Sequence, residues 1–338
     1  MSQLPSRNAP TASLLVLIAL AIGATGCDKP RAMGQMNQVV VASSDQIWSE
    51  LSADIDEALE SRAFTVRDER IFNISQIDPG SEEWGNLRLL RQVLVIGEQA
   101  DPWVAEAIDR HSGDTPTPPA VFQVRNVWAQ DQLVSVVLLA PGSDPATARP
   151  LLREAGSTLL AQYEQYARNR MFASGANEEL ADSLRRETGF TLMLPEVYYH
   201  REVRPRLFIF RNDFPDPSQL IRSVQVDSRP TAEVSFTPEG ARSWRAGITS
   251  EYTDPVQVTE SEIVRTRELA VGGRPAIEVQ GVWTNPPGEW PAAGPYITRM
   301  VQCGERTYLV DGWLYAPGSP KYEYMIQLGT ILDSFECV

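Results

Sequence analysis

Apolar residues recur with different spacings along the chain, and these spacings predict where its helices and strands lie. Over residues 45–61 and 145–171 apolar side chains recur every three or four positions, which is the pattern of a helix with one buried face. The same spacing returns at 178–186, after Gly175, and in a terminal segment at 321–335. We expect a helix in each of these segments, with strands in the short apolar runs between them.

The second half of the chain has the pattern of antiparallel strands. Pairs of apolar runs flank glycine turns, one at Gly272 and Gly273 and another at Gly304, so each pair predicts a hairpin. Antiparallel sheets covered by helices are the simplest way to bury these elements, which places the fold in the α+β class. The order of helix, hairpins and terminal helix in this half resembles small modules of the PsbP/Mog1 type. Such a resemblance concerns the fold alone.

The first residues carry the most specific local signal. Arg7 precedes an apolar run at 14–22, and small residues then lead to Cys27. The run is far shorter than the roughly 20 residues of a membrane-spanning helix and has the form of a secretory signal. The sequence around Cys27 resembles the lipobox of bacterial lipoproteins, in which the cysteine is acylated and becomes the first residue. The alternative is an ordinary signal peptide that leaves Cys27 as a free thiol.

The pattern therefore divides the chain into four parts. Residues 1–26 are the expected lipoprotein signal peptide, and residues 27–37 the lipidated cysteine and a polar tether. An N-terminal α+β half at 38–188 ends in a long helical segment, and a β-rich half with a terminal helix occupies 189–338. The lipid would hold the protein on a membrane of the bacterial cell envelope, facing the periplasm or the exterior. The sequence leaves open whether that is the inner or the outer membrane.

The cysteine count predicts a disulfide. With Cys27 acylated, Cys303 and Cys337 remain, in a compartment where disulfides form. We expect these two residues to be bonded. Two buried thiols are the alternative.

Composition narrows the function classes. The 338 residues have a net charge of −14, which argues against nucleic acid as a partner because phosphate binding relies on Lys and Arg. With two histidines and three cysteines there is little material for a metal site. The sequence contains no serine-hydrolase elbow, zinc-protease pair, phosphate loop or dinucleotide fingerprint. We therefore predict no catalytic residues, no metal and no cofactor.

Four stretches resemble the family DUF4837, bacterial envelope lipoproteins that contain a domain of unknown function. They are VVVASSDQIWSELSADIDEAL at 39–59, RNVWAQDQLVSVVLLAP at 125–141, GVWTNPPGEWPAAGPYITRM at 281–300 and VDGWLYAPGSPKYEYMIQLGTIL at 310–332. Together they span nearly the whole mature chain, so the resemblance implies one family unit. The chain departs from the family pattern at 293–296 and at Tyr322, so a ligand bound there could differ. The family brings no established reaction.

Aromatic residues near the C-terminus are the candidate binding residues. Trp290 lies in a Pro/Gly loop, and Tyr296, Trp283 and Trp313 lie close to it in sequence. Aromatic side chains on loops often anchor proteins or glycans, although a loop that packs Trp290 on its own sheet is the simpler alternative.

Three hypotheses follow for the function. The first is a non-enzymatic binding or accessory module whose partner is an envelope protein or membrane complex, contacted near 286–296. The second is an envelope hydrolase or glycan-processing enzyme whose carboxylates only the fold brings together. The third is a periplasmic carrier of a small ligand, which requires a sizeable apolar pocket.

Overall fold

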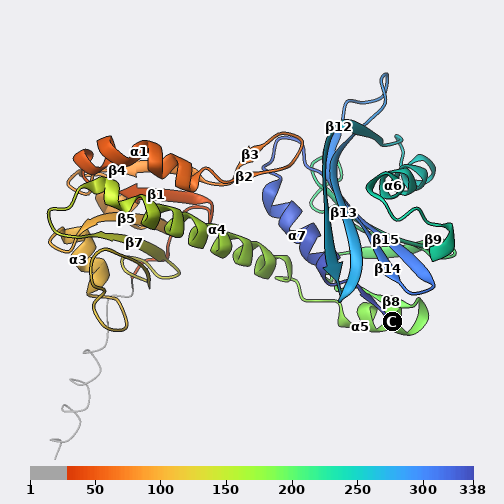
Figure 1. The fold of residues 1–338 in the computed structure, drawn as a ribbon, viewed down its shortest axis with the longest axis horizontal. Helices are drawn as coiled ribbons and strands as arrows, with labels where there is room; N and C mark the ends of the chain where they lie inside the picture. The colour runs from red at the N-terminus through yellow and green to blue at the C-terminus, as the bar shows by residue number, and fades with distance from the viewer. Residues whose placement is uncertain (1–28) are drawn as a thin grey trace, which may run out of the picture.

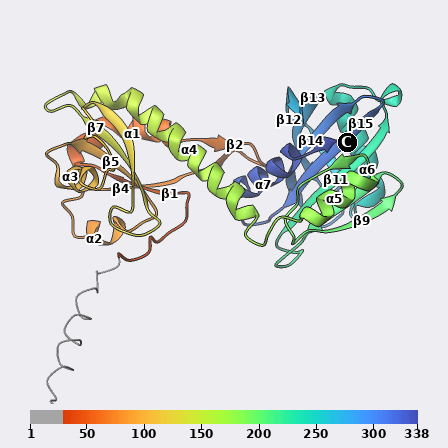
Figure 2. The ribbon, with the colours of Figure 1, turned by 90° about the horizontal axis from the view of Figure 1, so that it is seen from below.

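Two large sheets, each with a hydrophobic cluster on both of its faces, give the protein two lobes (Figures 1 and 2). The computed structural model describes residues 29–338. The predicted signal peptide and Cys27 lie outside the described residues. The N-terminal lobe comprises residues 29–171 and the C-terminal lobe residues 172–338. None of the helices within 29–338 is both long enough and apolar enough to cross a membrane.

The N-terminal lobe has a five-stranded sheet in the order β4-β1-β5-β7-β6. Its strands are β1 (Gln38–Ala42), β4 (Asn73–Ile77), β5 (Gln92–Glu98), β6 (Ala120–Arg125) and β7 (Leu133–Leu139). β1 runs parallel to β4 and β5, and β5 parallel to β7; only β6 and β7 pair antiparallel. The expectation of an antiparallel sheet is therefore wrong for this lobe. Its central strands read as continuous apolar runs because helices cover both faces.

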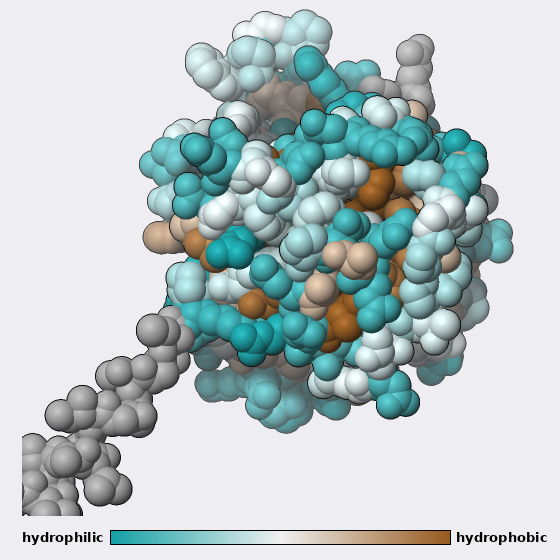
Figure 3. Space-filling model, turned by 90° about the vertical axis from the view of Figure 1, so that its left-hand side faces the viewer, coloured by the Kyte–Doolittle hydropathy of each residue, from teal (hydrophilic) through white to brown (hydrophobic). Residues whose placement is uncertain are grey.

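Helices cover this sheet on two sides. On one side lie α1 (Asp45–Leu59) and α4 (Arg149–Met171), the latter preceded by the 3₁₀ turn η1 (Pro145–Ala148). On the other side lie α2 (Trp84–Leu87) and α3 (Pro102–Ile108). The Ser44 hydroxyl accepts a hydrogen bond from the Ile47 amide at 3.3 Å, which caps α1. One end of this lobe is mainly hydrophilic, and apolar atoms show there only in small separate patches (Figure 3).

The C-terminal lobe has a seven-stranded sheet in the order β12-β13-β14-β15-β11-β10-β9. Its strands are β9 (Tyr199–Arg204), β10 (Leu207–Asn212), β11 (Ile221–Pro230), β12 (Val258–Val271), β13 (Arg274–Thr284), β14 (Ala293–Cys303) and β15 (Arg306–Tyr315). All neighbours pair antiparallel, and both predicted glycine-turn hairpins are confirmed as β12–β13 and β14–β15. With helices beside both sheets, the α+β class is confirmed.

Helices also lie on both faces of the C-terminal sheet. α5 (Glu178–Glu187) and α7 (Tyr322–Asp333) pack on one face, and α6 (Pro238–Tyr252) packs on the other, after the 3₁₀ turn η2 (Thr231–Glu233). Because α5 packs into the C-terminal core, the break between the lobes falls before α5. The boundary drawn after residue 188 is corrected accordingly.

The lobes meet where α4 passes α7. The rings of Tyr163 and Tyr322 stack there at 5.9 Å, and Arg170 pairs with Glu323 at 3.0 Å. Two short ribbons complete the fold, β2 (Arg62–Ala63) with β3 (Glu69–Arg70) and β8 (Phe190–Thr191) with β16 (Glu336–Cys337). The long helix α4 therefore extends from the N-terminal sheet to α7 of the C-terminal lobe.

A disulfide joins Cys303, at the end of β14, to Cys337 in β16, as the cysteine count predicted. Their Cα atoms are 5.9 Å apart, within the range that a disulfide spans. The bond fastens the C-terminal strand to the sheet.

Candidate functional site

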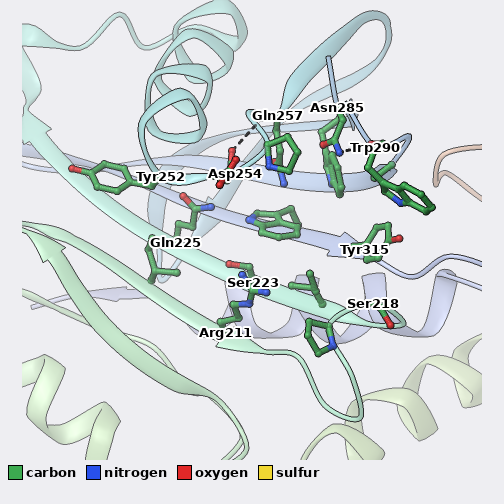
Figure 4. A pocket seen from close by; sticks show the side chains of 18 of the residues that line it. Arg211, Ser218, Ser223, Gln225, Tyr252, Asp254, Gln257, Asn285, Trp290 and Tyr315 are labelled. Carbon is green, nitrogen blue, oxygen red and sulfur yellow. Dashed lines mark hydrogen bonds between the residues drawn. The ribbon is translucent and has the colours of Figure 1, made fainter. Parts of the chain in front are cut away.

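A pocket of about 670 Å³ opens on the face of the C-terminal sheet that carries α6. Its floor consists of side chains from β10, β11, β13 and β15 (Figure 4). Its walls come from three connections: residues 217–218, residues 253–257 after α6, and residues 285–292 between β13 and β14. The sheet order brings these segments together, although they are far apart in the sequence.

The floor is aromatic. The indoles of Trp283 and Trp313 meet edge to face at 5.6 Å, and the ring of Tyr315 lies 6.3 Å from that of Trp283. Both indoles are buried, with 3% and 6% of their surface exposed. The Nε1 of Trp283 donates a hydrogen bond to the Leu314 carbonyl at 3.2 Å. This bond and the ring contacts hold the floor in one arrangement.

Gly294 makes room for the Trp283 indole. β14 lies between β13 and β15, yet none of its residues lines the pocket. Trp283 is paired across the strands with Gly294. A Cβ atom at position 294 would lie 1.8 Å from the Leu314 carbonyl oxygen and 2.7 Å from the Trp283 Nε1. A side chain at 294 would therefore displace the indole from the floor.

Aromatic side chains also stand at the two ends of the pocket. Figure 4 shows Trp290 and Tyr315 together at one end, and Tyr252, the last residue of α6, at the other. Trp290 is 74% exposed. The side-chain amide of Asn285 donates to the Trp290 carbonyl at 2.7 Å, which closes the loop that carries the indole.

Three buried polar atoms of the pocket residues lack a hydrogen-bond partner, on Gln225, Trp313 and Arg211. Gln225, on β11, is 2% exposed and lies beside Tyr252 and Asp254 in Figure 4. Neither its Oε1 nor the Nε1 of Trp313 has a hydrogen-bond partner within the described part of the chain. The same holds for the Nε of Arg211, so the pocket residues have one unused acceptor and two unused donors, which is uncommon for buried groups.

The pocket carries little charge. Among the described residues that line it, Asp254 is the one carboxylate and Arg211 the one cation. Arg211 is already paired with Asp213 at 3.2 Å. The remaining polar lining residues, such as Ser223 and Gln257, are neutral.

Comparison with protein families divides the chain at the boundary between the two lobes. Residues 177–334 match DUF4837, a domain of unknown function. The resemblance to this family is confirmed for that segment, which contains the whole pocket. Residues 32–174 match a different family, DUF8532, also a domain of unknown function. The expectation of one family unit over the whole mature chain is corrected, because the two N-terminal stretches at 39–59 and 125–141 lie in the DUF8532 match.

Several solved structures match part of the chain, at low sequence identity and low TM-scores. The solution structure of cyanobacterial PsbP (CyanoP) from Synechocystis sp. PCC 6803 is 11% identical with a TM-score of 0.32, over 44% of this chain and 87% of that one. LpqN, described as involved in cell envelope biogenesis of Mycobacterium tuberculosis, is 12% identical with a TM-score of 0.27, over 43% and 79%. A crystal structure from Bacteroides thetaiotaomicron VPI-5482 is 10% identical with a TM-score of 0.28, over 44% of this chain and 45% of its own. No curated protein matches the chain.

Three of the four candidate binding residues line the pocket: Trp283, Trp290 and Trp313. Tyr296 does not. Tyr296 is fully buried, and the Arg245 guanidinium lies 4.1 Å from the centre of its ring. Burial raises the pKa of its phenol above the ordinary value. The prediction of Tyr296 as a surface contact is therefore wrong: Tyr296 pairs with Trp313 on the same face of the sheet, but α6 covers it there.

The buried carboxylates of the DUF4837 segment are held by arginines. Asp227 pairs with Arg204 at 2.9 Å, Asp311 with Arg245 at 3.0 Å, and Glu278 with both Arg267 and Arg299 at 2.7 Å. The described residues contain no cluster of His, Cys, Asp and Glu that could hold a metal ion. These carboxylates are committed to ion pairs, and the pocket lining itself contributes Asp254 alone.

Sequence reasoning missed the polar residues of β11. Ser223, Gln225 and Asp227 alternate with Val224 and Val226 along β11, and all three are buried. Alternation places them on one face of the sheet. A row of polar residues on one face of a buried strand was the signal that could have pointed to a site.

Proposed function

We propose that this protein is a lipid-anchored cell-envelope protein that binds a small ligand in the C-terminal pocket and carries out no reaction on it. The pocket is the observation that carries this proposal. Its volume of about 670 Å³ lies in the range of small-molecule sites, which are mostly apolar with a few polar groups. Three tryptophans contribute to it, and one of them, Trp290, is exposed at its rim.

The pocket favours the carrier hypothesis over the hydrolase hypothesis. A glycoside hydrolase of the usual kind places two carboxyl groups about 5–10 Å apart on either side of the bond that it cleaves. The described lining of this pocket offers one carboxylate, Asp254. An experiment must distinguish a small ligand from a partner protein docked on the Trp290 loop. Such a partner would not contact Tyr296, because that residue is buried.

The anchor is tested by Cys27→Ser. We expect the wild-type protein in the membrane fraction, with a mass increased by its acyl chains, and the variant in the soluble fraction at its unmodified mass. Fractionation followed by intact-protein mass spectrometry measures both. A wild-type protein without acyl mass would refute the anchor and leave the pocket untouched.

The pocket is tested by ligand-observed NMR with a mixed library of saccharides, short peptides, fatty acids and nucleotides. We expect a hit whose binding is weakened about tenfold by Trp290→Ala, because exposed aromatic residues at a rim act as anchors. Glu289→Ala is the matched control, since Glu289 is exposed in the same loop and does not line the pocket. The absence of any ligand that depends on Trp290 would refute the proposal, and chemical conversion of the ligand would support the enzyme alternative.

A further inference from the structure

The aromatic side chains of the pocket present flat apolar surfaces at intervals along its length. Trp290 and Tyr315 lie at one end and Tyr252 at the other (Figure 4), and Trp313 also lines the pocket. Rings of this kind bind a ligand that has an apolar face and a polar edge. A pyranose ring has such a shape, with C–H groups on its faces and hydroxyls around its edge.

The unpartnered atoms of Gln225, Trp313 and Arg211 favour a ligand that both donates and accepts hydrogen bonds. The Oε1 of Gln225 is an acceptor and the Nε1 of Trp313 a donor, and both are buried. A hydroxyl group can serve either of them. An acyl chain serves neither, and the prolines of a proline-rich peptide lack the N–H that Gln225 would need. Sugar hydroxyls therefore fit these atoms better than the other ligands that aromatic pockets commonly take.

The charge of the pocket excludes most anionic ligands. Carboxylate and phosphate groups are bound by cations that can form charge-assisted hydrogen bonds. Arg211 is the one cation among the described lining residues, and Asp213 already neutralises it at 3.2 Å. The carboxylate of Asp254 would repel an anion bound at the Tyr252 end of the pocket. An uncharged ligand is the one that this lining accommodates.

We infer that the ligand of this pocket is an uncharged saccharide, whose ring faces pack on the aromatic side chains while its hydroxyls pair with Gln225 and Trp313. This inference rests on the proposed function of the pocket. The saccharide could be a free oligosaccharide or the exposed end of a surface glycan, because both present the same rings. The same stacking and pairing would act on either source.

Calorimetric titration tests the inference with neutral trisaccharides of glucose, mannose and N-acetylglucosamine. Trigalacturonic acid, a proline-rich decapeptide and palmitate serve as comparison ligands. We expect a neutral trisaccharide to bind, and its affinity to fall about tenfold in Trp290→Ala and about fivefold in Gln225→Leu. Glu289→Ala should bind like the wild type. Near-ultraviolet circular dichroism verifies the fold of Gln225→Leu, and Trp290→Ala supplies a second variant at an exposed position.

A second arm separates the two sources of the sugar. Retention of the protein on beads of an insoluble neutral polysaccharide, reversed by the free trisaccharide, indicates a surface glycan; binding of the trisaccharide alone indicates a soluble one. Either result supports the inference. Trp290-dependent binding of the peptide, palmitate or trigalacturonic acid in place of the neutral sugars overturns it and leaves the proposed function standing. If no probe binds in a Trp290-dependent way, both fail.

Discussion

Arg245 and Asp311 form a buried ion pair next to the pocket, and its energetics can be tested by a double-mutant cycle. Each side chain is 1% exposed, and the Nε of Arg245 lies 3.0 Å from the Oδ1 of Asp311. Arg245 also donates to Gln257, a pocket residue, at 2.7 Å, and Thr298 donates to Asp311 at 2.5 Å. The arrangement therefore joins α6 to the sheet beneath the pocket.

Removal of one partner leaves the other charge buried without compensation. We expect Arg245→Met and Asp311→Asn each to lower the free energy of unfolding by about 3–5 kcal/mol, the usual cost of breaking a buried pair. The double variant contains neither charge, and replacement of a whole buried pair is often close to neutral. The double variant should therefore lose less free energy of unfolding than the two single variants together, by about 2–3 kcal/mol.

Urea unfolding, followed by tryptophan fluorescence and far-ultraviolet circular dichroism, measures the cycle in a soluble chain that carries Cys27→Ser. The pair of Arg149 and Asp54, at 2.8 Å and with side chains 51% and 23% exposed, provides the control. The same substitutions there should give a coupling energy below about 1 kcal/mol. Additive losses at Arg245 and Asp311 would refute the reasoning, because they would mean that neither buried charge depends on the other.

Two further predictions concern the stability of the C-terminal lobe. Burial would raise the pKa of the Glu278 carboxyl, but hydrogen bonds from Arg267 and the charge of Arg299 outweigh it and hold this pKa below the ordinary value of 4.5. The stabilisation by Glu278 is therefore present above about pH 4.5 and is lost as the pH falls through the lowered pKa. In Glu278→Gln the urea midpoint of unfolding should therefore depend less steeply on pH in that acidic range. A slope equal to that of the wild type would contradict this. Cys303→Ser should lower the free energy of unfolding by about 4 kcal/mol, because the disulfide to Cys337 closes a loop between residues 34 apart in the sequence. Equal urea midpoints with and without reductant in the wild type would argue against that figure.

Features that depend on neighbouring residues could be predicted well. Glycine turns form the two C-terminal hairpins, because backbone conformations within a few residues decide such turns. The pairing of Cys303 with Cys337 followed from composition and compartment. The parallel N-terminal sheet was missed because a buried apolar run has the same appearance in either direction of pairing.

The sequence by itself determined the helices α1, α4, α5 and α7, the two glycine-turn hairpins and the aromatic character of the C-terminal segment. Only the tertiary structure decided that Trp283, Trp290 and Trp313 share one pocket and that Tyr296 lies in the core. Periodicity shows that two residues lie on one face of a strand, whereas the neighbour of that strand depends on contacts between distant segments. β11 lies beside β15, and that pairing sets Gln225 among the aromatic residues of the pocket.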